Sequence, residues 1–163
     1  RRPEAAEQLP EAEALAGLAG VLVQLNQVDS PVWTAKCDVW ELAEFDPLEL
    51  DAESENESVG AACYVDLLPC EPGKWTKHED AAEWCRQVCA QLRGVVLRNC
   101  RMDLVVRAAD IGEAVTEHAV TAYASAAGAN HVQAKRRLTD ALAAFADALV
   151  PVKPRRDTAK KLQ

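Results

Sequence analysis

Four segments of this chain alternate between apolar and polar side chains, and a period of two residues is that of a β-strand. They comprise residues 32–42, 59–68, 99–107 and 118–126. Because successive side chains of a strand point to opposite faces, the alternation predicts one antiparallel sheet with a dry face and a wetter face. The dry face is expected to carry aliphatic residues together with Ala35, Cys37, Cys63 and Cys100.

Helical patterns precede the first strand and separate the second strand from the third. Residues 3–27 begin with glutamates among alanines and leucines, which favours a helix, although alternation over residues 20–28 leaves a strand as the alternative there. Thr76 and Glu79 match a T-x-x-E capping box, which predicts the start of a helix that Gly94 ends. The inward stripe of this helix would consist of Ala81, Trp84, Cys85, Val88, Cys89 and Leu92.

A last amphipathic helix should follow the fourth strand. Asn130 and Gln133 have the spacing of a helix cap, and the apolar period continues to Val150 before prolines end it. Its inward stripe would consist of Leu138, Ala141, Leu142, Phe145 and Leu149. The expected order is α-β-β-α-β-β-α, an α+β fold in two layers, with one antiparallel sheet of about four strands and helices packed on one face.

Length and charge set the domain organisation. The 163 residues suffice for a single domain, which we expect over residues 1–150, with an acidic loop at 43–58 and a basic, disordered tail at 151–163. The formal net charge is −8, and the chain before the tail is more acidic still. Such a body repels phosphate backbones, so nucleic acid is a poor first choice of partner. The longest apolar stretches are too short to cross a bilayer, so no membrane span is expected.

The six cysteines are expected to be reduced, because the chain is longer than the small domains that depend on disulfides. We therefore expect a reducing compartment such as the cytoplasm, and the start at Arg1-Arg2-Pro3 leaves a processed N-terminus open. Cys70, which lies in a proline-rich turn, is expected to be the most exposed thiol.

Two groups of residues have types that could support chemistry. Cys85 and Cys89 lie one helical turn apart and could form a zinc site with Cys63, Cys70 or His78, but no pair of C-x-x-C motifs is present. Thiols packed beneath a sheet are the simpler interpretation, because free cysteine behaves as a small hydrophobe. We predict no metal site and no cofactor.

A Cys-His-Asp arrangement of Cys100, His118 and Asp103 is the second group. The strand phase argues against it, because Cys100 should face the core while Asp103 faces away. No catalytic residue is therefore predicted.

The wetter face of the sheet is the predicted functional surface. Aromatic rings beside arginines are typical of recognition surfaces, although a loop or the first helix covering the rings is the alternative. Asp38, Asp66 and Asp103 share this face with Lys36 and two arginines, which favours cross-strand ion pairs over a carboxylate metal site. The predicted partner-binding residues are Trp40, Tyr64, Arg101, Tyr123, Asp38, Asp66 and Arg107.

These patterns predict a non-enzymatic module that binds another protein or a second copy of itself, as an assembly factor, a chaperone or a subunit of a larger complex. The small acidic α+β plan, with a helix at each end, is similar to the dimeric chaperones of type III secretion systems. That resemblance is one of architecture and implies no site. The alternatives are a small thiol- or metal-dependent enzyme and a binder of single-stranded nucleic acid.

Overall fold

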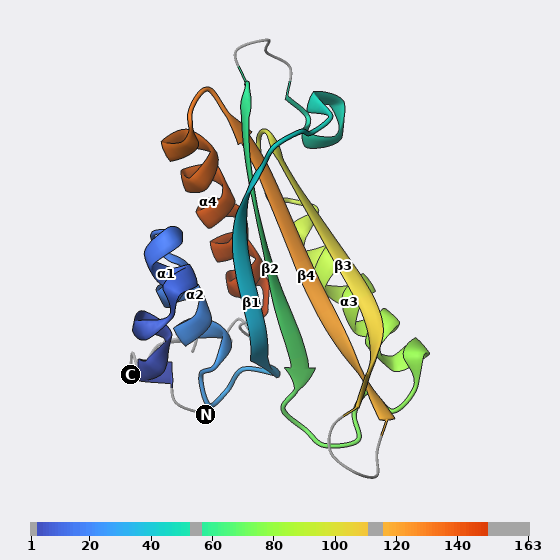
Figure 1. The fold of residues 1–163 in the computed structure, drawn as a ribbon. Coiled ribbons are helices and arrows are strands. Elements are labelled where there is room, and N and C mark those ends of the chain that lie inside the picture. Colours follow the sequence, from blue (N-terminus) through green and yellow to red (C-terminus); the bar gives the residue numbers. More distant parts are fainter. Residues whose placement is uncertain (1–2, 53–56, 111–115, 150–163) are drawn as a thin grey trace, which may run out of the picture.

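A computed structural model describes residues 3–52, 57–110 and 116–149, in which one antiparallel sheet is covered on one side by helices (Figure 1). The strands are β1 (Val32–Leu42), β2 (Val59–Pro69), β3 (Cys100–Asp110) and β4 (Thr116–Gly128). The α-helices are α1 (Pro10–Ala14), α2 (Leu18–Leu25), α3 (His78–Leu92) and α4 (His131–Leu149). Two 3-10 helices, η1 (Pro3–Gln8) and η2 (Pro47–Leu50), complete the described elements. The predicted α+β class is confirmed, and the order differs in that short helices replace the first one and η2 lies between β1 and β2.

The strands lie in the order β1-β2-β4-β3, and every neighbouring pair is antiparallel. β1 pairs with β2 and β3 pairs with β4, while β2 and β4 join the two halves at the centre of the sheet. The dry face packs on the helices as predicted. Cys63 is fully buried there, and Cys37 and Cys100 are half-buried against the same core.

The first strand contains a β-bulge that changes which face its side chains occupy. The register with β2 shifts between Thr34 and Lys36, so that Ala35 is an extra residue without a partner. From Lys36 onward the alternation follows the prediction. Ala35 itself is exposed, so its predicted place on the dry face was wrong.

The N-terminal helix is interrupted at Gly17, which has a φ of +90°. A side chain at this position would be strained by the backbone and would lie 2.6 Å from Cγ2 of Thr139 on α4. α2 then begins at Leu18, so the strand alternative for residues 20–28 is not adopted. Leu18, Leu22 and Val21 are buried, and α2 packs against α4.

The two long helices differ in how well their starts and stripes were predicted. The predicted capping box at Thr76 was wrong. The helix α3 begins at His78, and its N-cap residue, Lys77, makes no side-chain hydrogen bond. Cys89, predicted inward, is exposed. On α4 the cap is confirmed: the backbone N of Gln133 donates to Oδ1 of Asn130 at 2.9 Å. The whole predicted stripe of α4 is buried.

The described part of the acidic segment is folded onto one end of the sheet. Asp46 caps η2 by accepting a hydrogen bond from the backbone N of Leu48 at 2.9 Å. A small apolar cluster beneath η2 consists of Leu50, Ala52 and Ala127 with the half-buried Phe45. Residues 53–56 of this segment and the basic tail predicted for 151–163 lie outside the described residues. Among the described helices, none is both long and apolar enough to cross a membrane.

Candidate functional site

The candidate site is the open face of the sheet, by which we mean the side that points away from the helices. In Figure 1, α3 and α4 pass behind the strands, while η2 is the described helix that reaches the opposite side at one end of the sheet. The predicted alternative, in which the first helix covers the rings, is therefore not adopted. Trp40 retains 38% of its surface exposed.

Three rings form what we call the aromatic ladder, consisting of Trp40, Tyr64 and Tyr123. Tyr64 lies directly opposite Tyr123 in the register of β2 and β4, with ring centroids 5.9 Å apart. Trp40 lies opposite Ala62, and this small residue lets the indole lean toward Tyr64 at a centroid distance of 6.1 Å. Both ring pairs are tilted, within the range where aromatic contacts are favourable.

On the open face, the side chain of Asp66 links its own strand, β2, to both β4 and β3. Its Oδ1 accepts a hydrogen bond from Oγ1 of Thr121 on β4 at 2.5 Å and one from Nη2 of Arg107 on β3, also at 2.5 Å. Thr121 has no exposed surface, so this carboxylate satisfies a buried hydroxyl. The cross-strand ion pair is of the kind predicted from the sequence.

A second charged group lies at the end of the face nearest η2. Nε and Nη2 of Arg101 donate to the two carboxylate oxygens of Asp103 at 2.7 and 3.1 Å. Nη1 of Arg101 also lies 3.4 Å from Glu49 of η2. These acids raise the pKa of Arg101, Asp103 most of all. The acidic segment is thus tied to the open face by charge as well as by its apolar cluster.

Lys36 and Asp38 lie beside the ladder on the edge strand β1. Nζ of Lys36 lies 5.8 Å from the centroid of the Tyr64 ring, the geometry of a cation–π contact. A hydrogen bond and charge interaction with Tyr64 raise the pKa of Lys36, and the carboxylates of Asp66 and Asp38 act in the same direction. Asp38 is exposed, and its Oδ1 accepts a hydrogen bond from the backbone N of Val39 at 2.8 Å.

Sequence reasoning missed a fourth aromatic residue of this face, Trp33. The bulge at Ala35 reverses the alternation before it, so Trp33 pairs with Leu68. Leu68 has the phase of Tyr64 and Asp66, and residues directly opposite in a sheet share a face. No sequence signal marks the bulge, because alanine is compatible with either face.

Four of the six cysteines are poor candidates for nucleophilic chemistry. Burial raises the pKa of Cys37, Cys85 and Cys100 to about 11 and that of Cys63 to about 12. The thiolate is the reactive form, so these groups are protonated at neutral pH. The predicted exposure of Cys70 was wrong: it is half-buried, and Cys89 is the exposed thiol.

The Cys-His-Asp arrangement is not assembled. Asp103 is paired with Arg101, while Nδ1 of His118 lies 3.1 Å from the carbonyl oxygen of Trp75. The ring of His118 meets the ring of His78 edge-on, at a centroid distance of 5.9 Å. Within residues 3–52, 57–110 and 116–149, no group of three or more His, Cys, Asp or Glu could hold a metal ion.

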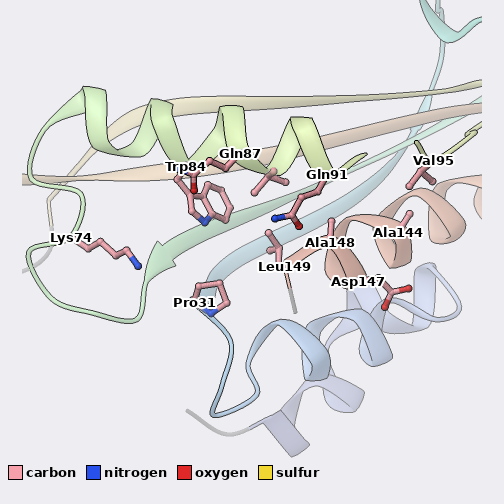
Figure 2. Close-up of a pocket in the computed structure, with 11 residues that line it drawn as sticks. Pro31, Lys74, Trp84, Gln87, Gln91, Val95, Ala144, Asp147, Ala148 and Leu149 are labelled. Carbon is pink, nitrogen blue, oxygen red and sulfur yellow. The ribbon is translucent and has the colours of Figure 1, made fainter. Parts of the chain in front are cut away.

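A groove of about 920 Å³ lies between α3 and α4 on the opposite side of the molecule. Figure 2 shows Trp84 and Gln91 projecting from α3 toward Leu149 at the end of α4. The charged side chains in its lining are Lys74 and Asp147, and Asp147 accepts a hydrogen bond from Gln24 at 2.8 Å. The lining is mostly apolar, and helical periodicity gave no indication of the groove.

Comparisons with known proteins leave this geometry as the basis for assigning a function. No protein-family model matches the chain, and no curated protein or solved structure matches it either. The fold and site define a two-layer α+β protein whose sheet has one open face, with aromatic rings at its centre and ion pairs beside them.

Proposed function

We propose that this protein is a non-enzymatic binding module that recognises another protein through the open face of its sheet, as an assembly factor, a chaperone or a subunit of a complex. The observation that supports this proposal above all is the aromatic ladder, which lies on a face that no described α-helix covers. Tryptophan, tyrosine and arginine are the residues most enriched among the hot spots of protein interfaces.

The ion pairs beside the ladder favour this use of the face. Asp66 and Asp103 hold Arg107 and Arg101 in place before any partner arrives. Side chains that are already ordered lose less rotamer freedom on binding, which leaves more of the contact energy for affinity. The rings of Tyr64 and Tyr123 are likewise fixed by their mutual contact.

The two alternative functions have less support. Arg101 and Arg107 are already paired with carboxylates, so contact with phosphate would have to break those pairs in an acidic chain. An enzyme based on thiols would need an accessible thiolate, whereas burial keeps Cys37, Cys63 and Cys100 protonated.

The test is a quantitative pull-down from the source cells with the full chain as bait. Trp40→Ala/Tyr64→Ala should reduce recovery of the wild-type partners about tenfold or more, because each hot-spot truncation costs on the order of 2 kcal/mol. The matched control is Val28→Ala/Val132→Ala, which changes two side chains that are 99% and 79% exposed away from the face. Circular dichroism checks that both variants are folded. A folded ladder variant that recovers the same partners as the wild type contradicts the proposal.

A further inference from the structure

The two edge strands of the sheet differ in how open they are to another strand. On β1, the side chain of Asn26 accepts a hydrogen bond from the backbone N of Thr34 at 3.1 Å and donates one to its hydroxyl at 2.7 Å. The bulge at Ala35 interrupts the same edge. β3 instead pairs with β4 over its whole length without a register shift. A long, regular edge strand is a template for pairing with another chain.

The sequence of β3 is complementary to itself in the antiparallel direction. If a two-fold axis passes through Val105, each residue lies opposite the one equally far on the other side of that centre. Asp103 then faces Arg107 of the second copy, and Arg107 faces Asp103. Asp103 keeps its pair with Arg101 and Arg107 keeps its pair with Asp66, and each gains a second group of opposite charge across the axis on the open-face side. On the helix side, Leu104 faces Val106 of the second copy.

This arrangement favours one register over its neighbours among those that keep the two faces of the sheet apart. Moving the centre to Val106 would place Asp103 opposite Ala109 and Arg107 opposite Val105, so that no ion pair would form across the axis. Moving the centre by one residue to Leu104 would place Arg101 opposite Arg107 of the second copy, and like charges directly opposite are destabilising. Moving it to Asp103 would place that carboxylate opposite itself. At the proposed centre, Val105 is 40% exposed, an apolar side chain that strand pairing would cover.

We propose that two copies of this chain associate through β3, in antiparallel register about a two-fold axis at Val105, to form a continuous eight-stranded sheet. Such an interface is isologous, with the same strand contributed by both copies. The axis is perpendicular to the sheet, so both open faces lie on the same side. The dimer does not depend on the proposed function, but where that function holds, the partner meets two aromatic ladders on one surface.

The first test is the mass of the particle in solution, by light scattering coupled to gel filtration. Wild-type protein should reach twice the 17.7 kDa of the chain at concentrations up to about 200 μM, where even a micromolar complex is well populated. Val105→Lys places two ammonium groups at the axis and should give a monomer. Val28→Lys, on a side chain that is 99% exposed in the α2–β1 turn, should stay dimeric. A wild-type monomer, or a dimer that survives Val105→Lys, overturns the proposal.

The second test uses charge, and it is specific for the register. Asp103→Arg alone places arginines opposite each other, and Arg107→Asp alone places aspartates opposite each other, so each variant should dissociate about tenfold or more readily than wild type. Mixing the two variants restores both ion pairs and should yield a heterodimer by native mass spectrometry. Two variants that remain dimeric alone, or folded variants that do not associate when mixed, contradict the proposed register.

The ladder variant separates this proposal from the proposed function. Trp40→Ala/Tyr64→Ala should remain dimeric, since neither residue lies on β3. If that variant becomes monomeric while Val105→Lys stays dimeric, the second copy binds the open face and the β3 interface is refuted. If the ladder variant loses its partners but keeps its mass, both proposals stand.

Discussion

Replacing Asp66 with alanine should destabilise the protein far more than the same change at the neighbouring Asp38. Both aspartates lie on the open face, but Oδ1 of Asp66 accepts hydrogen bonds from Thr121 and Arg107, each at 2.5 Å. The Asp66 side chain is only 18% exposed and Thr121 is fully buried. Asp38 is exposed, and its carboxylate accepts a hydrogen bond from the backbone N of Val39.

The expected magnitude follows from what each change leaves behind. Asp66→Ala leaves the Thr121 hydroxyl buried without this acceptor, which costs about 1 to 3 kcal/mol. The pair with Arg107 adds at most about 1 kcal/mol, because the Arg107 side chain is 47% exposed and water screens the pair. We therefore expect a loss of about 2 to 3 kcal/mol for Asp66→Ala and about 0.5 kcal/mol or less for Asp38→Ala.

A double-mutant cycle measured by urea unfolding tests the reason for the difference. Thr121→Val removes the buried donor, so adding it to Asp66→Ala should cost much less than it does in the wild-type background. The coupling free energy between the two positions should be about 1 kcal/mol or more. The reasoning is refuted if the two losses simply add, or if Asp66→Ala and Asp38→Ala have equal effects.

Three further predictions concern backbone packing and the thiols. Gly128→Ala should destabilise by about 1 to 3 kcal/mol, because its Cβ would lie 2.6 Å from the backbone N of Ala134. Gly20 is an exposed position of α2 with open space around it, so Gly20→Ala should stabilise by about 0.5 to 1 kcal/mol, and equal urea midpoints of the two variants would contradict this. In native protein Cys89 should react first with a thiol reagent, ahead of the buried Cys63, as located by mass spectrometry; the reverse order would contradict the burial argument. Burial raises the pKa of Cys63 from 9.0 to about 12, so the unfolded chain ionises first and the free energy of unfolding should fall as pH rises above 9.0. The fall should be smaller in Cys63→Val, and an identical fall in both proteins would count against this origin.

The strands could be predicted because alternation records burial directly. β1 has the predicted bounds, and the stripe of α4 is buried at each predicted position. The failures lie where burial depends on a distant part of the chain. Cys89 has the spacing of an inward residue on α3, but the width of the buried stripe depends on what packs against the helix, so the thiol stays exposed. The burial of Leu50 depends on where η2 meets the sheet, and an acidic composition gives no sign of it.

On the open face, the sequence predicted which side the rings occupy but not which rings are in contact. Alternation predicted the side on which Trp40, Tyr64 and Tyr123 lie, but contact between the rings also needs the register that sets Tyr64 opposite Tyr123. Register is a property of two strands together, so one strand's pattern cannot supply it. The bulge at Ala35 has the same consequence, because a single extra residue places Trp33 on the face of the ladder, whereas unbroken alternation with Cys37 would place it on the dry face. The aromatic surface is therefore larger than alternation alone predicts. It extends along β1 toward Val32, the end of the strand away from the acidic segment.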